Sequence, residues 1–198
     1  MYCILMSGLP ASGKTTVAEY ISEKMNLSVI SKDDIKEILF DTIGFTSREN
    51  KLKLGIASSG IMNYIVEKMM QNNLPFIVDN NFENTGASEI KNLVKKYNYD
   101  AVTVLVDGDI DIIYGRFIER DKSPDRHRGH VVNTMYPEKE TNQSEPILDK
   151  DTFESRYVGR DMRDFAVGKK FTVDSSYEGE DDLISLVNNI KYYVGMND

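Results

Sequence analysis

The sequence predicts an α/β fold in which helices cover both faces of a parallel sheet. Short apolar runs alternate along the chain with longer segments whose apolar residues recur at helical spacing. Residues 101–106 form an uninterrupted, largely β-branched run, which is typical of a strand covered on both faces. Strands that alternate with helices form parallel sheets, because each connecting helix packs back onto the sheet. Strands are expected at 2–6, 28–31, 76–79, 101–106 and 170–174.

The helices are justified by the same spacing and by residues that favour helix ends. Ser47, for example, is a candidate cap for a long helix that runs to about residue 73. Helices are expected at 15–25, 33–40, 47 to about 73, 87–98, after Asp109, at 151–165 and at 181–194. The side of the long helix expected to face the core carries Leu52, Ile56, Ile61, Ile65 and Met69.

We expect one domain over residues 1–198, because no repeat, low-complexity tract or linker divides the chain. From about 122 to 149 the helical periodicity is lost, and Pro124, Pro137 and Pro146 interrupt a polar stretch. This stretch is expected to be a mobile lid. A chain of this length buries roughly 70% of its unfolded surface, so it needs no disulfide or metal ion to fold.

Charge and cysteine content argue against several classes of protein. The 24 Lys and Arg residues face 32 Asp and Glu residues, and the net charge of -8 disfavours binding of long nucleic acid. The single cysteine, Cys3, lies in an apolar run and is expected to pack as a small hydrophobic residue in a reducing, cytoplasmic setting. A glycine-rich motif begins too close to Met1 for a secretion signal. No apolar run approaches the ~20 residues of a membrane helix, so no membrane partner is expected.

Residues 8–15 match the phosphate-loop pattern G-x-x-x-x-G-K-[ST], between the first expected strand and the first expected helix. In such a loop the backbone N–H groups and the helix N-terminus surround a phosphate. Lys14 is expected to reach the β- and γ-phosphates, and the Thr15 hydroxyl to ligate Mg²⁺. No N-K-x-D segment of the GTPase type is present, so a small ATP-dependent kinase is favoured. The residues expected to bind ATP are Gly8, Leu9, Pro10, Ala11, Ser12, Gly13, Lys14, Thr15 and Thr16, together with Arg120.

Carboxylates follow two of the expected strands, on the same edge of the sheet as the phosphate loop. Asp79 ends the third strand and is expected to act on Mg²⁺ through a water. Asp33 follows the second strand, where it could accept the proton of an attacking hydroxyl. The alternative for Asp33, and also for Asp34, is to cap the helix that begins there. Asn80 and Asn81 are either acceptor ligands or turn residues.

Basic residues gather on the helix after the fourth strand and just beyond it. Arg116 and Arg120 are spaced i, i+4, so both guanidinium groups project from one face. An arginine beside the γ-phosphate stabilises the transferring group; the alternative is a solvated face paired with neighbouring acids. Residues 125–130 are locally basic and could close over ATP or the acceptor. His127 and His130 lack a third ligand, so no zinc site is expected.

Together these motifs resemble the P-loop kinases of the polynucleotide 5′-hydroxyl kinase and zeta-toxin type, within the AAA_33-like ATP-binding proteins. The resemblance covers residues 1 to about 135. It implies a P-loop NTPase fold, with three α/β/α layers and a five-stranded parallel sheet in the order 2-3-1-4-5. The motifs that carry it are GLPASGKTT at 8–16, SKDDIK at 31–36, VDNN at 78–81, and Arg116 with Arg120.

The resemblance also implies roles for individual residues. Asp33 would be the general base, and Lys36 and Asn81 would contact the acceptor. Lys36 stands where the family has an arginine, and a lysine loses bidentate recognition of a phosphate. Asp79 matches the family's metal-side acid. The expected catalytic residues are Lys14, Asp33, Arg116 and Arg120.

These observations favour a kinase that uses ATP and Mg²⁺ and phosphorylates a hydroxyl group. The acceptor stays open among a small molecule, a nucleoside or nucleotide sugar, and a nucleic-acid 5′ end. The rival interpretation is an ATP-binding switch that hydrolyses ATP and transfers nothing. An antitoxin-like partner would also fit the resembled family, and residues 137–165 resemble no segment of known role.

Overall fold

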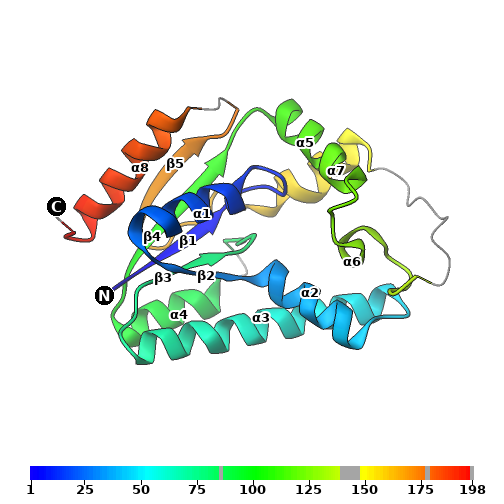
Figure 1. Cartoon of the computed structure of the whole chain (residues 1–198), viewed down its shortest axis with the longest axis horizontal. Helices are drawn as coiled ribbons and strands as arrows, with labels where there is room; N and C mark the ends of the chain where they lie inside the picture. The colour runs from blue at the N-terminus through cyan, green and yellow to red at the C-terminus, as the bar shows by residue number, and fades with distance from the viewer. Residues whose placement is uncertain (85–86, 139–147, 177–178, 197–198) are drawn as a thin grey trace.

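The computed structural model describes residues 1–84, 87–138, 148–176 and 179–196, and it confirms the expected sheet. Five parallel strands lie in the order β2-β3-β1-β4-β5 (Figure 1). The strands are β1 Tyr2–Ser7, β2 Ser28–Ser31, β3 Phe76–Asp79, β4 Asp100–Asp107 and β5 Lys169–Asp174. The central position of β1 places the loop that follows it in the middle of the sheet edge where the strands end.

The α-helices are α1 Lys14–Met25, α2 Lys32–Ile43, α3 Arg48–Gln71, α4 Ser88–Tyr97, α5 Ile110–Lys122, α6 Arg128–Val131, α7 Lys150–Tyr157 and α8 Glu180–Tyr193. The expected helix at 151–165 is wrong in its second half. A short 3₁₀ turn, Val158–Arg160, follows α7, and Asp161 then takes a left-handed conformation with φ of 50°. The helix ends there because Met162 and Phe165 belong to different hydrophobic clusters, which one helix would not reach.

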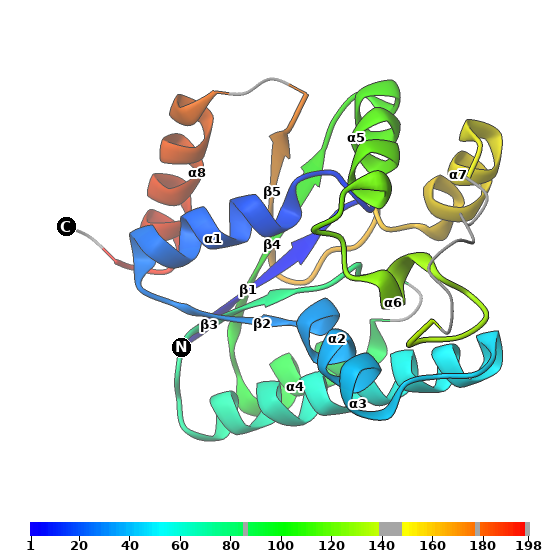
Figure 2. The ribbon, with the colours of Figure 1, turned by 45° about the vertical axis from the view of Figure 1, so that its right-hand side comes forward.

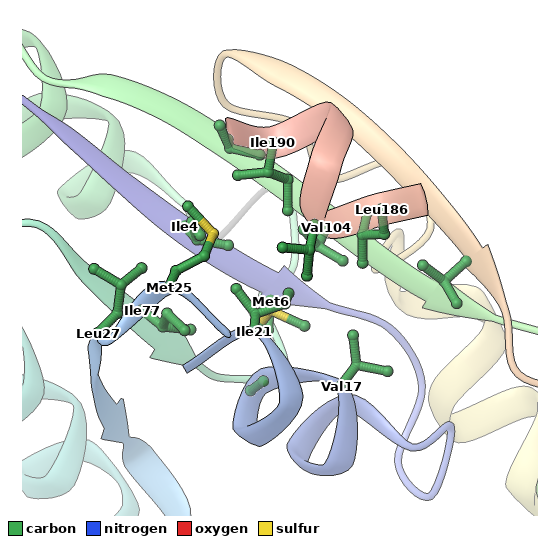
Figure 3. Packing of buried hydrophobic residues seen from close by; sticks show 14 of the residues in the cluster. Ile4, Met6, Val17, Ile21, Met25, Leu27, Ile77, Val104, Leu186 and Ile190 are labelled. Carbon is green, nitrogen blue, oxygen red and sulfur yellow. The ribbon is translucent and has the colours of Figure 1, made fainter. Parts of the chain in front are cut away.

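Alternating side chains of the sheet pack against helices on opposite faces. Ile4 and Met6 of β1 lie in one cluster with Val17 and Ile21 of α1 and Ile190 of α8, as Figure 3 shows. Cys3 and Leu5 point the other way, into a cluster built with α3 and α4. Cys3 is fully buried there, which confirms that it packs as a small hydrophobic residue, and burial raises the pKa of its thiol to about 12.

The buried side of α3 differs from the expected one. Leu52 and Ile56 are 59% and 72% exposed, Ile61 is also exposed, and Ile65 and Met69 are only partly buried. The residues that face the core are Leu54, Ser58, Met62, Val66 and Met70. The fully buried Ser58 explains the error, because a hydroxyl interrupts the apolar pattern in the sequence. In the structure that hydroxyl donates to the carbonyl of Gly55 at 2.8 Å, so its burial costs little.

The segment after α5 folds back over α2 and α3, and α6 lies between α5 and this helix pair (Figure 2). Phe45 and Tyr136 form an antiparallel bridge in which each backbone N–H donates to the other's carbonyl at 2.8 Å. Lys51 of α3 donates to the carbonyls of His130 and Val132 at 2.8 and 2.6 Å. Residues 127–136 of the expected lid are therefore packed against α2 and α3, Leu148 packs with α5, and residues 139–147 lie outside the described residues. Within the described chain, no helix is long and apolar enough to cross a membrane.

The buried side of α3 can be checked by substitution. Met70→Ala is expected to lower the free energy of unfolding by about 2–5 kcal/mol, because it empties a site that is 1% exposed. Ile56→Ala, on the exposed side, is expected to change it by less than about 0.5 kcal/mol. Urea unfolding followed by circular dichroism measures both; equal losses would contradict the assignment of faces.

Candidate active site

A cavity of about 550 Å³ opens where the strands end, and it gathers most of the residues singled out from the sequence. Those that line it are Pro10, Ala11, Gly13, Lys14, Thr15, Thr16, Asp33, Lys36, Asp79, Asn81, Arg116 and Arg120. Gly8, Leu9 and Ser12 do not line it but are buried in the loop behind it. Asn80, also singled out from the sequence, lines the cavity, which in addition brings in Ser31, Lys32, Glu83, Arg126, His130, Tyr157, Arg160 and Met162.

The phosphate loop depends on close backbone packing. Gly8 has φ of 141°, and a Cβ there would collide with the carbonyl oxygen of Val106 at the end of β4. Gly13 has φ of 92°, a backbone conformation that favours glycine even though a Cβ at this position would meet no close neighbour. The side chain of Leu9 points away from the cavity into a cluster with Phe117 and Phe153, which fixes the loop against α5 and α7.

The loop presents groups suited to a phosphate. Lys14 is 8% exposed, and its ammonium donates to the carbonyl of Leu9 at 2.8 Å. Burial lowers the pKa of Lys14 to about 8, against the opposing charges of Asp79 and Asp33. The Ser12 hydroxyl is buried and has no hydrogen-bond partner among the described residues. The Lys14 ammonium lines the cavity at the start of α1, where it fits an anion with several acceptor oxygens.

Thr15 and Asp79 join α1 to the end of β3. The Thr15 hydroxyl donates to a carboxylate oxygen of Asp79 at 2.7 Å. Burial raises the pKa of Asp79, while this hydrogen bond and Lys14 act in the opposite direction. Within the described residues no group of three or more His, Cys, Asp or Glu side chains could hold a metal ion. Two adjacent oxygen ligands fit Mg²⁺, which usually takes one or two protein groups and completes its shell with water and substrate phosphates.

At the start of α2, Asp34 takes part in the helix cap, whereas Asp33 lines the cavity. Ser31 is the N-cap, and its hydroxyl accepts from the N–H of Asp34 at 3.1 Å and donates to the Asp34 carboxylate at 2.8 Å. Asp34 therefore belongs to the cap. In the part of the chain that the structure describes, no hydrogen bond or ion pair engages the carboxylate of Asp33, which is exposed on the cavity wall.

The charges around Asp33 favour its ionised form. Partial burial raises the pKa of Asp33, but the positive charges of protonated His130, Lys36 and Arg126 outweigh it, so the pKa lies below its usual range. Burial lowers the pKa of His130 to about 3, although Asp33 favours its protonated form. His130 is therefore neutral at pH 7, and its Nε2 lies 2.9 Å from a carboxylate oxygen of Glu37. The remaining cations, Lys36 and Arg126, still favour an ionised Asp33.

Arg116 and Arg120 occupy different parts of the site. Arg116 donates to the carbonyl of Ser175, after β5, at 2.8 Å, and it lines both this cavity and a second one of about 650 Å³. The Nε groups of Arg120 and Arg126 are buried without a hydrogen-bond partner in the described residues. The nearest acid, Asp121, lies 3.6 and 3.8 Å from them, beyond hydrogen-bond distance. Both arginines line the cavity, and each lies within ion-pair distance of Asp121.

Several of these lining residues were not predicted individually. Arg126 and His130 lie in the locally basic stretch 125–130, so composition indicated the segment but not the residues. Arg160 and Tyr157 come from a region in which no motif was recognised, and only the turn after α7 brings them to the cavity. Their position depends on tertiary packing, which leaves no local signal in the sequence.

Comparison with known proteins gives a family match over residues 3–136, with the description AAA domain, AAA_33. The chain belongs to the AAA_33 family. The matched span contains the phosphate loop, Asp33 and Asp79, and the cavity-lining arginines Arg116, Arg120 and Arg126.

One relative of this AAA_33 chain is the L-seryl-tRNA(Sec) kinase of Methanococcus maripaludis, 27% identical over 145 residues. The alignment covers 70% of this chain and 52% of that kinase, so the chain spans about half the length of this relative.

Solved structures share the AAA_33 chain's fold at low identity. A protein from Chloroflexus aurantiacus, provisionally assigned as a kinase, superposes with a TM-score of 0.79 at 23% identity and covers 96% of this chain and 97% of its own. A sugar kinase from Janibacter sp. HTCC2649 gives 0.56 at 12% identity, with 99% of this chain and 95% of its own covered. A gluconokinase from Sinorhizobium meliloti 1021 gives 0.52 at 14% identity, with 97% of each chain covered.

The protonation state of His130 can be measured directly. Because burial lowers its pKa to about 3, the His130 ring is expected to stay neutral from pH 8 to pH 5. Nuclear magnetic resonance titration of the histidine ring protons, assigned with His130→Gln, would then show no shift for His130 in that range. A midpoint near the usual ~6.5 would contradict the described burial.

Proposed function

We propose that this AAA_33 protein is a kinase that transfers the γ-phosphate of ATP to a hydroxyl group of an acceptor. The observation that carries the proposal is the Asp33 carboxylate, which no described hydrogen bond or ion pair engages and which lines the same cavity as Lys14 and Arg120. A nucleotide switch needs the phosphate loop but has no use for an ionised carboxylate placed to receive a hydroxyl proton.

ATP would bind with its phosphates on the loop of residues 8–16 and on Lys14. Thr15, and Asp79 through a water, would hold Mg²⁺, which neutralises charge on the phosphate oxygens when bound. Arg116 is proposed on the nucleoside side, because the second cavity that it lines also carries the largely apolar groups Val17, Tyr20 and Leu183. This departs from the sequence-based interpretation, which placed both arginines on the transferring phosphoryl group.

Transfer would form a bond from the acceptor oxygen to the γ-phosphorus and break the bond to the β–γ bridging oxygen, which leaves with ADP. The hydroxyl proton passes to Asp33. A weak base such as a carboxylate with a lowered pKa suffices, because in a loose transition state the acceptor hydroxyl loses its proton late. Arg120 and Arg126, which line the cavity and whose Nε groups donate no described hydrogen bond, are proposed to stabilise charge on the equatorial oxygens.

The acceptor is proposed among hydroxyl-bearing small molecules, nucleosides, nucleotide sugars and nucleic-acid 5′ ends. A relative named as an L-seryl-tRNA(Sec) kinase supports a hydroxyl acceptor in general and does not select among these. The finer resemblance to polynucleotide kinases and zeta toxins remains a hypothesis. Nothing in the described residues supports an antitoxin-like partner.

The deciding experiment is an assay with γ-labelled ATP and Mg²⁺ against a panel of sugars, nucleosides, nucleotide sugars and 5′-hydroxyl oligonucleotides. Label in an organic product supports the kinase. Label released only as inorganic phosphate, whatever acceptor is present, supports the ATP-hydrolysing switch and contradicts the proposal.

Asp33→Asn is expected to lower kcat for transfer by about 10²–10⁴-fold, the usual contribution of a general base, while the Kd for ATP stays the same. Single-turnover transfer and equilibrium titration with a fluorescent ATP analogue measure the two quantities. Asp34→Asn, which alters the cap next door, is the matched control and should retain transfer. Wild-type turnover in Asp33→Asn would remove Asp33 from the mechanism.

Lys14→Ala is expected to weaken both ATP binding and turnover, because the variant loses the buried ammonium of the loop. A loss of about 10-fold or more in ATP affinity corresponds to one charge-assisted hydrogen bond. Calorimetric titration with ATP and Mg²⁺ measures it. An unchanged Kd would refute the assignment of the loop.

If Arg116 and Arg120 contact different parts of ATP, their substitution should affect different kinetic constants. Arg116→Ala is expected mainly to raise the KM for ATP, and Arg120→Ala mainly to lower kcat, by about 10²-fold or more. Initial rates over a range of ATP concentrations measure both. The same loss of kcat in both variants would restore the sequence-based interpretation.

A further inference from the structure

A basic cavity, distinct from the one of about 650 Å³ that Arg116 lines, lies between α2 and the first half of α3, next to the candidate active site. We call it the α2–α3 groove; its volume is about 380 Å³. It is lined by five cations, Lys32, Lys36, Arg48, Lys51 and Arg160, and by Leu52, Gly55, Ile56, Ser59 and Asn133. None of these described lining residues is a carboxylate. In a chain of net charge -8, this is an unusual concentration of positive charge.

Helix geometry brings these cations together. Lys32 and Lys36 are four residues apart on α2, so they share one face. Arg48, Lys51 and Gly55 are spaced three and four residues apart on α3, so they share one face of the helix. Gly55 has no side chain and leaves the floor of the groove open. A Cβ at Gly55 would lie 3.7 Å from Cε of Lys36, so a larger side chain there would enter the groove.

The fold neutralises only part of this charge. Arg160 lies 3.4 Å from a Glu83 oxygen, and Lys51 donates to backbone carbonyls of the segment after α5. Lys32 and Arg48 form no ion pair within the residues that the structure describes. Burial lowers the pKa of Lys36; Asp33 opposes this, and Lys32 adds to it. An anion in the groove would relieve this accumulation of positive charge.

The groove is continuous with the candidate active site. Lys32, Lys36 and Arg160 line both cavities. A molecule whose hydroxyl lies at Asp33 would therefore reach the groove by passing Lys36. Binding of a second part of the acceptor there would hold the hydroxyl in place before transfer.

We propose that the α2–α3 groove binds a phosphate carried by the acceptor, with Arg48, Lys32 and Lys36 as its ligands. The acceptor is then a phosphorylated alcohol, either a small sugar phosphate or a nucleic-acid end with a phosphate beside the reacting hydroxyl. A phosphate, as a dianionic monoester or a monoanionic diester, matches two lysines and an arginine that lie together without a carboxylate lining the groove. This inference rests on the proposed function and narrows its substrate class.

The test compares acceptors that differ only by a phosphate. Label transfer from γ-labelled ATP is measured with ribose against ribose 5-phosphate, and with uridine against uridine 3′-monophosphate and a 5′-hydroxyl tetranucleotide. At least one phosphorylated acceptor is expected to exceed its neutral partner about 100-fold in kcat/KM. The ribose and uridine arms distinguish a sugar phosphate from a nucleic-acid end. Equal rates within each pair would overturn the proposal.

Arg48→Glu tests the groove itself. The residue is exposed at the first position of α3, where a carboxylate is favourable, so the variant is expected to fold. It should raise the KM for the phosphorylated acceptor about 10-fold or more and leave kcat nearly unchanged. Lys53→Glu makes the same charge reversal on α3 outside the groove, where Lys53 is paired with Glu49, and should change neither constant. Equal effects of the two variants would overturn the proposal.

A binding measurement separates this inference from the proposed function. Calorimetry with ribose 5-phosphate and uridine 3′-monophosphate uses protein saturated with ADP and Mg²⁺, so that the phosphate loop is occupied. Binding that Arg48→Glu abolishes, without any label transfer, would support the groove and contradict the kinase. Transfer to neutral acceptors alone would support the kinase and contradict the groove. Neither binding nor transfer would contradict both.

Discussion

The site depends on the close approach of the phosphate loop to the end of β4. Gly8 lies against the carbonyl of Val106, so closely that no side chain fits between them. This contact fixes where the loop leaves β1, and the burial of Leu9 against α5 and α7 fixes its other side. With the loop held in this way, Lys14 and Thr15 start α1 at the centre of the sheet edge. The carboxylates at the ends of β2 and β3 can then reach the same cavity.

Most of the fold could be predicted because the signals are local. The strands are short apolar runs, and the order of the sheet followed from the resemblance that the phosphate loop and strand-end motifs established. The buried face of α3 could not be predicted, since its apolar residues surround the helix and a buried serine interrupts the pattern. The end of α7 was missed for a related reason: the chain turns where two hydrophobic clusters, far apart in sequence, each require a side chain.

The sequence predicted the site residues that belong to a motif, but not those that only tertiary packing brings to the cavity. Asp79 ends β3, and Lys14, Thr15 and Asp33 begin the helices that follow β1 and β2, so their convergence follows from a parallel sheet. The sequence left Asp33 open between base and cap; in the structure the neighbouring Ser31 caps α2, and the role of Asp33 as the base stays a prediction. Arg160 enters the cavity only through tertiary packing after α7, so nothing near it in the sequence indicated a role.

Lys51 connects two parts of the molecule that are far apart in sequence. It lines the α2–α3 groove, and it also holds the carbonyls of His130 and Val132 in the segment after α5. If this segment detached from α3, the Lys51 ammonium would lose these two acceptors while it still lines the groove. Binding of an anion to Lys51 and detachment of the segment would then be thermodynamically linked. The anion would favour detachment by the same free energy by which detachment favours binding of the anion.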